Sequence, residues 1–476
     1  DRGLMARAGE PVTIYGKVER VQKSGRGENE LLFDHVIEVN SIEFEKDNET
    51  VDVQKHKDEF TELAKNEDAV DIFAESIAPN LHATDEWEAA FEFAVAYLFG
   101  APRIDIDNGP TYRGDLHFLI ISDYGMGKSD FKTDIEAYSP NALSKSTTAL
   151  SSDVGLTAAA VKDDFGEGQW TIKPGLLVRA NNGHLILDEI DKGPDELTNM
   201  NDALEGEQVV DIEKAGQSVT YDSKTAVMAL GNPVEGRFNP RDPIASQLGI
   251  DESLLSRFDA IVTMQDFPDR EQDEKVAGTF GKAYTEAQQA QYGDRTDFEQ
   301  LERKVPIDVG QAWIKYAREN INPVLDYEQF EELKEWYAEE VRPLNEEFSD
   351  KSGESQDMPV PATVRELAAA SKMAIAFARV HLRDTVESKD IERAKKLGKT
   401  LVKQNWDGEK FNATKDVGTQ STWTREKRIQ WLKDTLEGEA LSEEEIVSRA
   451  NESGMRETKI DGDIEKLKNR GEIYEP

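Results

Sequence analysis

The spacing of apolar residues changes several times along the chain and predicts elements of different kinds. Apolar and polar positions alternate over residues 11–44 around a glycine-containing turn at 24–27, which predicts the end of a small β domain. Residues 59–99 instead have helical spacing, with a break at Ala78-Pro79. From residue 116 onward, short apolar runs alternate with helical segments, which predicts a parallel α/β sheet with crossover helices. These apolar runs cover residues 116–121, 183–187, 225–230 and 260–264.

The C-terminal part of the pattern is mainly helical. Residues 270–404 are helical in pattern and highly charged, whereas residues 405–422 are rich in Gly, Asp and Thr and are predicted to be a linker. Three short helical patterns follow, and residues 471–474 have the character of a strand start. Three short helices and a β wing are the outline of a winged helix. The helical patterns cover residues 425–436, 442–453 and 458–469.

Length and residue usage narrow the class of protein. A chain of 476 residues is long enough for roughly two to four domains. Cysteine is absent, so the chain can form neither disulfides nor thiolate metal sites. There is no apolar run of about 18 residues and no basic then apolar leader, so we expect an intracellular protein without a membrane span. The first residue, Asp1, favours a fragment or a processed product.

The charge balance is strongly acidic. The chain has 57 Lys and Arg residues against 96 Asp and Glu residues, a net charge of −39. This balance fits either a very soluble surface or adaptation to multimolar salt, where screening removes repulsion between carboxylates, and we favour the salt adaptation. An acidic balance argues against a nucleic-acid partner, because phosphate contacts normally need a basic footprint. Any contact with DNA must therefore depend on local residues.

The segment after the first buried run has the form of a phosphate-binding loop. It reads Ser-Asp-Tyr-Gly-Met-Gly-Lys-Ser and matches the P-loop motif except that Ser122 replaces the first glycine. A phosphate cradle needs inward-facing backbone N–H groups at a helix N-terminus, a lysine for the terminal phosphates and a hydroxyl for Mg²⁺. The alternative is a chance glycine loop. The predicted ATP-binding residues are Ser122, Asp123, Tyr124, Gly125, Met126, Gly127, Lys128 and Ser129.

Two acids follow a second apolar run about sixty residues later. In a P-loop enzyme the first acid, Asp188, would hold hydrated Mg²⁺, and the second, Glu189, would orient and deprotonate the attacking water. A strand followed by two acids also occurs by chance at surface turns. The pairing with Lys128 at this distance favours ATP hydrolysis.

Two further polar residues stand at the ends of apolar segments. Asn232 follows a strand and could contact the γ-phosphate or the lytic water, although a strand-end Asn is more often a turn cap. Arg257 lies between an apolar helix end and a strand, which fits either an arginine finger that enters a neighbour's site or a structural salt bridge.

These four pieces occur in the order of AAA+ ATPases, and the surrounding motifs resemble the MCM family of replicative DNA helicases. The resemblance runs from about residue 10 to the end of the chain. It is carried by Asp-Glu-Ile-Asp-Lys at 188–192, Lys-Ala-Gly at 214–216, Gly-Asn-Pro at 231–233, Leu-Ser-Arg-Phe-Asp at 255–259, Arg-Gly-Asp-Leu-His at 113–117, Gly-Leu-Thr-Ala-Ala at 155–159 and Ser-Ile-Ala-Pro at 76–79.

The resemblance implies an AAA+ P-loop core with a helical lid, a partial N-terminal OB-like β domain and a C-terminal winged helix. The implied boundaries are 1–50 for the β domain, 51–270 for the core, 271–404 for the lid, 405–422 for the linker and 423–476 for the winged helix. The resemblance implies that one set of residues binds the chain's own ATP and Mg²⁺ and that another set reaches the nucleotide of the adjacent subunit. The active form would then be an oligomer, which in this family is a ring of six. The first set is Lys128, Ser129, Asp188, Glu189 and Asn232, with Ser129 and Asp188 on the metal, and the second is Arg113, Arg257 and Arg365.

The resemblance also implies contacts with DNA inside the ring. A helix-2 insert at 155–177 and a presensor 1 hairpin at 209–221 would carry them, with Lys214 on the phosphate backbone regardless of base sequence. From the residues alone, Lys-Ala-Gly between strands is most often a solvated turn. The implied function is an ATP-dependent 3′ to 5′ helicase that translocates on single-stranded DNA and unwinds duplex DNA during replication, as a homohexamer with replication or loading factors as partners.

Several departures from the family pattern favour a divergent archaeal homologue, borne by a virus or plasmid. Ser122 and Tyr124 stand where the family usually has Gly and Pro, which we expect to alter the loop and its affinity for nucleotide. The N-terminal tier is incomplete and lacks the cysteine zinc site frequent in the family. Two alternatives stay open: an inactive or non-processive MCM-like subunit that binds DNA or joins a ring, and another helix-2-insert AAA+ remodeller.

Overall fold

The computed structural model describes most of the chain up to residue 404. The chain divides into two compact units, Asp1–Trp406 and Asp407–Pro476, and every element named below belongs to the first. The predicted linker lies outside the described residues, and so does the predicted winged helix apart from Ile446 and Arg449, which are helical. The described residues are 12–22, 33–44, 51–149, 155–162, 170–193, 197, 200–214, 217–239, 244–294, 297–344, 363–404, 446 and 449.

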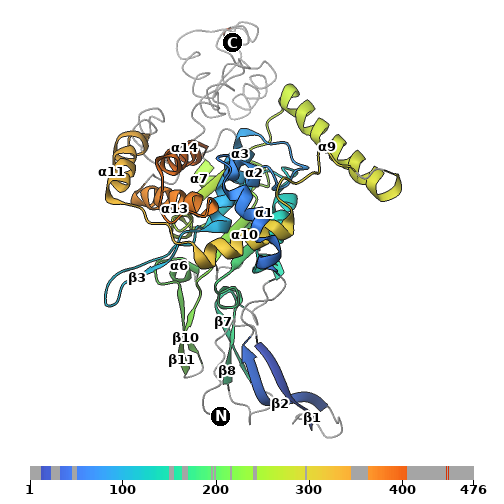
Figure 1. The fold of residues 1–476 in the computed structure, drawn as a ribbon, viewed down its shortest axis with the longest axis vertical. Coiled ribbons are helices and arrows are strands. Elements are labelled where there is room, and N and C mark those ends of the chain that lie inside the picture. The colour runs from blue at the N-terminus through green and yellow to red at the C-terminus, as the bar shows by residue number, and fades with distance from the viewer. Residues whose placement is uncertain are drawn as a thin grey trace, which may run out of the picture. The chain divides into compact units, whose positions relative to one another are not determined.

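A five-stranded sheet forms the centre of the first unit, and all its neighbouring strands are parallel (Figure 1). The prediction of a parallel α/β fold is therefore confirmed. Four strands coincide with the predicted apolar runs, whereas the edge strand β6 was missed because three of its five residues are polar and none is fully buried. In spatial order the strands are β13 (Ala260–Met264), β5 (Phe118–Ser122), β12 (Ala226–Gly231), β9 (His184–Asp188) and β6 (Ala142–Ser146).

The two faces of the sheet bury separate apolar cores, because successive strand residues point to opposite faces. On β5, Phe118 and Ile120 belong to the larger core, whereas Leu119 and Ile121 belong to the smaller one. The smaller core is closed by the short helices α5 (Leu176–Arg179), α6 (Met200–Ala203), α7 (Ile244–Gln247) and α8 (Glu252–Leu255). The larger core is closed by α1 (Val53–Ala64), α2 (Ala69–Ala74), α3 (Asp85–Phe99), α4 (Lys128–Tyr138), α10 (Ile307–Asn320), α13 (Val364–Val380) and α14 (Ser388–Gln404).

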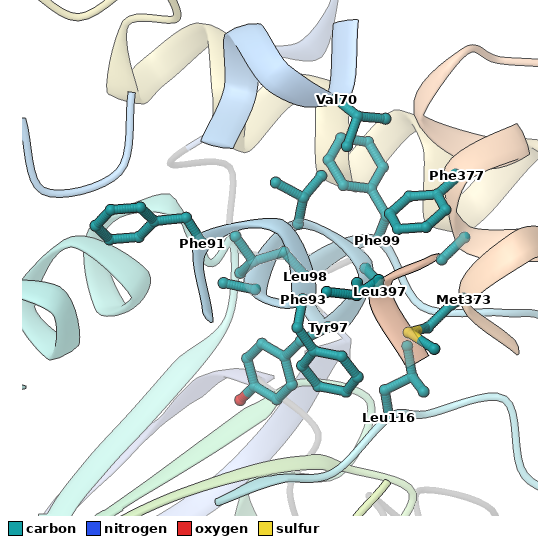
Figure 2. Packing of buried hydrophobic residues seen from close by; sticks show 14 of the residues in the cluster. Val70, Phe91, Phe93, Tyr97, Leu98, Phe99, Leu116, Met373, Phe377 and Leu397 are labelled. Atoms are coloured by element: carbon teal, nitrogen blue, oxygen red, sulfur yellow. The ribbon is translucent and has the colours of Figure 1, made fainter. Parts of the chain in front are cut away.

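Helix α3 is the centre of the larger core. It begins at Thr84, whose side chain accepts a hydrogen bond from the backbone of Trp87, and it ends at Gly100, where φ is +58°. Figure 2 shows Phe99 of α3 beside Phe377 of α13, whereas Phe91 points to the other side of the helix. The buried Arg379 donates to the carbonyls of residues 99 and 100, so the lid is joined to α3 by polar contacts as well.

The described residues in the rest of the lid are mainly helical, as the sequence predicted. Helix α9 (Arg270–Tyr292) is largely exposed and leads to α10, and α11 (Tyr327–Trp336) continues into a π-helical turn over Tyr337–Val341. Helix α13 begins with a capping box, in which Thr363 and Glu366 satisfy each other's backbone N–H groups. Among the described residues, no helix is long and apolar enough to cross a membrane.

In the part of the chain that the structure describes, four antiparallel strand pairs accompany the parallel sheet. The predicted N-terminal strands form β1 (Val12–Gln22) and β2 (Phe33–Phe44), with an irregularity in register between Tyr15 and Gly16. The predicted helix-2 insert contains β7 (Ala158–Lys162) and β8 (Trp170–Pro174), and the predicted presensor 1 hairpin contains β10 (Val209–Lys214) and β11 (Gln217–Asp222). A short fourth hairpin joins β3 (Ile104–Asp105) to β4 (Thr111–Tyr112).

Candidate functional site

The carboxyl ends of the parallel strands meet at one edge of the sheet, which is where ligands bind in open α/β folds. The P-loop follows β5, Asp188 ends β9, and Asn232 follows β12. Since β5, β12 and β9 are adjacent in the sheet, the structure brings these residues together. We call this edge the nucleotide edge, and its residues coincide with the predicted first set.

The backbone of the P-loop has the conformation that a phosphate cradle needs. Gly125 and Gly127 have φ values of +86° and +89°, a region that other residues rarely adopt. Gly127 is the N-cap of α4, so the loop delivers the chain directly to a helix N-terminus with Ser129 exposed on its first turn. Such a terminus presents unpaired backbone N–H groups and a partial positive charge, both of which favour phosphate.

The two departures in the P-loop are accommodated without loss of this conformation. Ser122 is the buried last residue of β5, and its hydroxyl donates to the carbonyl of Asp123 over 3.0 Å. Tyr124 is 54% exposed, and its ring lies against Gly236, where a Cβ atom would come within 2.6 Å of the ring. A side chain at position 236 would therefore displace Tyr124.

The outer wall of the loop comes from residues that the sequence analysis did not assign. The indole of Trp87 donates to the carbonyl of Met126 over 3.1 Å, and Leu81 packs so closely that a Cβ atom on Gly127 would lie 2.5 Å from its Cδ2. Both residues follow the Ser-Ile-Ala-Pro motif, whose position near the loop could not be read from spacing alone.

Asp123 holds the loop to two other segments. Its buried carboxylate accepts hydrogen bonds from the backbone N–H of Phe238 over 2.7 Å and from that of Asp266 over 2.8 Å. These donors follow β12 and β13, so one side chain connects the P-loop to the segments after two neighbouring strands. The carboxylate is thus engaged inside the protein, although the sequence analysis included Asp123 among the ATP-binding residues.

Lys128 lies between the ends of β5 and β12. Its ammonium donates to the carbonyls of Ser122 and Gly231, each over 2.8 Å. Burial lowers the pKa of Lys128 to about 8, against the opposing effect of Asp191 and other nearby acids. The ammonium can exchange these carbonyls for phosphate oxygens, which are stronger partners.

The two acids at the end of β9 have different surroundings. Asp188 accepts from Lys132 over 2.6 Å, so its charge is neutralised by a lysine one helical turn after Lys128. Glu189 has a φ of +58°, and its carboxylate accepts from Lys192 over 2.8 Å, from Ser146 over 2.7 Å and from a threonine beside it. These hydrogen bonds lower the pKa of Glu189 to about 2. Glu189 is therefore ionised, but it has to leave these donors before it can take a proton from water.

Asn232 is fixed in place from both ends. Its amide nitrogen Nδ2 donates to the carbonyl of Ser122 over 2.8 Å, and its backbone N–H donates to Asp191 over 3.0 Å. The side chain is buried beside the P-loop rather than capping a turn at the surface. Asp191, which the sequence analysis did not assign, thereby connects Asn232 to the segment that carries Glu189.

The three predicted trans-acting arginines gather at the opposite edge of the sheet, which we call the arginine edge. Arg113 precedes β5 and Arg257 precedes β13, so both lie at the amino ends of strands. Arg365 of α13 donates to the carbonyl of Ser256. The pKa of Arg365 is lowered by burial and by the positive charges of Arg257 and Arg113. The intervening strand β5 has five residues, a length of roughly 16 Å at about 3.3 Å per residue.

Asp259 organises the arginine edge. Its carboxylate accepts from Arg113 over 2.7 Å, from the backbone N–H of His117 over 2.7 Å and from Lys372 of α13. Burial alone would raise the pKa of Asp259, but Arg113 and Lys372 hold it well below its usual range. Arg113 also donates to the carbonyl of Arg257 over 3.2 Å. The sequence analysis missed Asp259 as a site residue although it closes the Leu-Ser-Arg-Phe-Asp motif.

Arg257 itself pairs with Glu205, and its Nε is buried without a hydrogen-bond partner. Lys214 is the last residue of β10, opposite Gln217 in the hairpin, and the side chain of Lys214 lies outside what the structure describes. The structure thus places the predicted residues in two clusters and one hairpin.

Comparisons with known proteins agree with these motifs. The family model of the MCM P-loop domain matches residues 56–284, and that of the MCM AAA-lid domain matches residues 309–402. The minichromosome maintenance protein MCM of Saccharolobus solfataricus is 29% identical over 483 residues, covering 99% of this chain and 66% of that protein. An uncharacterized MCM-type protein of Methanocaldococcus jannaschii is 30% identical over 426 residues, covering 87% of this chain and 58% of that protein.

Eukaryotic proteins match as well. The DNA replication licensing factor MCM4 of Arabidopsis thaliana is 30% identical over 347 residues, covering 73% of this chain and 38% of that protein. This chain therefore spans under two thirds of the length of these relatives. The matched models, the AAA+ fold and the motifs in their order lead to one assignment: the chain belongs to the MCM family.

Proposed function

We propose that this chain is the motor of an ATP-dependent DNA helicase, which translocates on single-stranded DNA and unwinds duplex DNA during replication. The observation that carries the proposal is the separation of the nucleotide edge from the arginine edge. Because a strand's length lies between them, Arg257 cannot reach its own P-loop without unfolding the sheet. Each ATP site then needs the arginine edge of a neighbouring subunit, which a closed ring of identical chains supplies.

In this proposal the nucleotide edge binds ATP and cleaves its terminal phosphate. Lys128 and the N-terminus of α4 hold the phosphates, and Asn232 orients the attacking water. Glu189 leaves its three donors and accepts a proton from that water. Arg257 and Arg365 of the neighbouring subunit stabilise the charge that develops on the transferred phosphoryl group, and Arg113 holds the backbone of Arg257.

The residues present fit a magnesium ion. Mg²⁺ prefers oxygen ligands, and the exposed hydroxyl of Ser129 and the carboxylate of Asp188 are both at the nucleotide edge. When bound, the ion would neutralise part of the negative charge of the phosphates. Lys132 already neutralises Asp188, so a divalent ion would replace one cation by another at this carboxylate.

Contacts with DNA are assigned to the hairpins β7–β8 and β10–β11, with Lys214 on the phosphate backbone. Such contacts are insensitive to base sequence, as a translocating motor requires. The partners would be single-stranded and duplex DNA and five further copies of this chain, with replication or loading factors acting on the ring. A motor of this kind would work in the cytoplasm at the nucleoid.

The test is ATP hydrolysis in multimolar KCl with Mg²⁺, with and without single-stranded DNA. We expect DNA to raise the rate of the wild-type protein. Lys128→Ala should abolish hydrolysis, Lys214→Ala should remove the stimulation by DNA, and Lys389→Ala, an exposed lysine of the lid, serves as the matched control. Hydrolysis without stimulation by DNA would favour a remodeller of other substrates. Absence of hydrolysis in a folded, oligomeric wild-type protein would overturn the proposal and favour a structural ring subunit.

A further inference from the structure

The lid helix α13 contacts the arginine edge through two cations on one face. Arg365 donates to the carbonyl of Ser256, and Lys372 donates to Asp259 and, over 3.3 Å, to the carbonyl of Asp115. Arg365 and Lys372 are seven residues apart, which is close to two helical turns, so they project from the same side of α13. The lid therefore contacts the core at Ser256 and at Asp259, which lie on either side of Arg257 in the sequence.

Lys372 is an unusual residue for such a contact, because its side chain is only 12% exposed. Burial and the nearby Arg113 lower the pKa of Lys372 to about 8, against the opposing effect of Asp259. A buried ammonium is costly unless an opposite charge accepts its hydrogen bonds, so the pair with Asp259 restricts where α13 can lie.

The same carboxylate also determines where Arg257 lies. Asp259 is two residues after Arg257, and it binds Arg113, whose guanidinium holds the carbonyl of Arg257. The carboxylate of Asp259 thus binds Lys372 of the lid directly and is connected to the backbone of Arg257 through Arg113. Among the described residues, Lys372 is the lid residue paired with this carboxylate.

We propose that Lys372 is a positioning residue for the trans half of the ATP site. Through Asp259 it seats the lid so that Arg365 and Arg257 meet the neighbouring subunit's nucleotide as one unit. Lys372 itself contacts no nucleotide. The inference rests on the proposed function, since it assumes that the arginine edge completes a neighbour's site.

A mixing experiment separates this role from a general effect on stability. A Lys128→Ala subunit lacks a working P-loop but keeps its arginine edge, whereas a Lys372→Met subunit should keep its P-loop and lose the function of its arginine edge. Each variant alone should hydrolyse ATP at least tenfold more slowly than wild type. In rings mixed at equal amounts, about a quarter of the junctions combine the two intact halves, so activity should return to about that fraction of the wild-type rate.

Three controls make the result specific. Lys372→Arg keeps the charge and should retain most activity. Arg393→Met removes a comparable ion pair between the lid and the core, that of Arg393 with Asp71 and Glu92, which lies outside the arginine edge. It should leave the rate per folded subunit near that of wild type. Lys128→Ala mixed with Arg257→Ala tests whether sites are shared between subunits at all.

The outcomes are distinct. If Lys128→Ala and Arg257→Ala restore activity together but Lys128→Ala and Lys372→Met do not, the positioning role is refuted while the shared site stands. A wild-type rate for Lys372→Met would also refute it. If neither mixture restores activity, the proposed function fails as well. Should Lys372→Met not fold, Lys372→Gln, which keeps a hydrogen-bond donor without the charge, enters the same mixture.

Discussion

Raising the pH should weaken ATP binding through Lys128 before it affects the fold. In the proposed function the ammonium of Lys128 binds phosphate, and its pKa in the protein without nucleotide is about 8. When bound phosphates stabilise the charged form, the apparent dissociation constant rises about tenfold between pH 7 and pH 9, equivalent to about 1.4 kcal/mol. Most of this change should occur above pH 8.

Raising the pH has the opposite effect on stability: it weakens ATP binding but raises the free energy of unfolding through Lys128. Burial depresses the folded-state pKa of Lys128, so between about pH 8 and its ordinary value of 10.5 the unfolded chain binds more protons than the folded chain. The free energy of unfolding of the protein without ATP should therefore gain from this group as the pH rises through that window. If unfolding caused the loss of affinity for ATP, the free energy of unfolding would instead fall over the same pH range.

The assay is equilibrium binding of a non-hydrolysable ATP analogue at constant multimolar KCl and Mg²⁺ from pH 7 to pH 9. Lys128→Arg keeps its charge throughout this range, so its affinity should stay level. Lys372 also has a pKa of about 8, and repeating the titration with Lys372→Arg removes its contribution. A wild-type affinity that changes less than twofold would refute the reasoning.

Three further changes test separate parts of the structure. Phe377→Ala removes a fully buried ring from the larger core and should lower the free energy of unfolding by about 3 to 5 kcal/mol in a denaturant titration, where a loss below 1 kcal/mol would contradict the packing. Asp123→Ala leaves the buried backbone N–H of Phe238 without its acceptor, at about 1 to 3 kcal/mol, together with the half-buried N–H of Asp266, and should weaken ATP binding at least tenfold by calorimetry. Ser146→Ala with Thr148→Val removes two donors from Glu189 and should raise hydrolysis in the absence of DNA, and an unchanged rate would show that release of Glu189 is not a barrier.

Much of the nucleotide edge could be predicted because parallel strands bring distant residues to one place. The sequence placed Ser122, Asp188 and Asn232 at the ends of apolar runs in a predicted parallel sheet, and the structure shows that these strands are neighbours. The edge strand β6 was not predicted, since it has one neighbouring strand and three of its five residues are polar. Its Ser146 consequently escaped notice as a partner of Glu189.

The contacts at the arginine edge could not be read from the sequence. Lys372 and Asp259 are 113 residues apart, and Arg113 and Asp259 are 146 apart, so no local spacing relates the partners. A lysine in a helical, charged region is normally solvated. Only the packing of α13 against the core shows that Lys372 is buried. Adaptation to high salt, the domain boundaries and the individual site roles stay predictions.

Under the proposed function, the placement of the two half-sites on opposite edges of one sheet would make hydrolysis depend on contact between subunits. A newly made chain without neighbours would bind ATP without cleaving it. Unassembled subunits would therefore not hydrolyse ATP. Turnover per subunit would rise with protein concentration and reach a plateau when rings close. Under this arrangement the onset of hydrolysis reports assembly, and dilution alone is enough to switch the motor off.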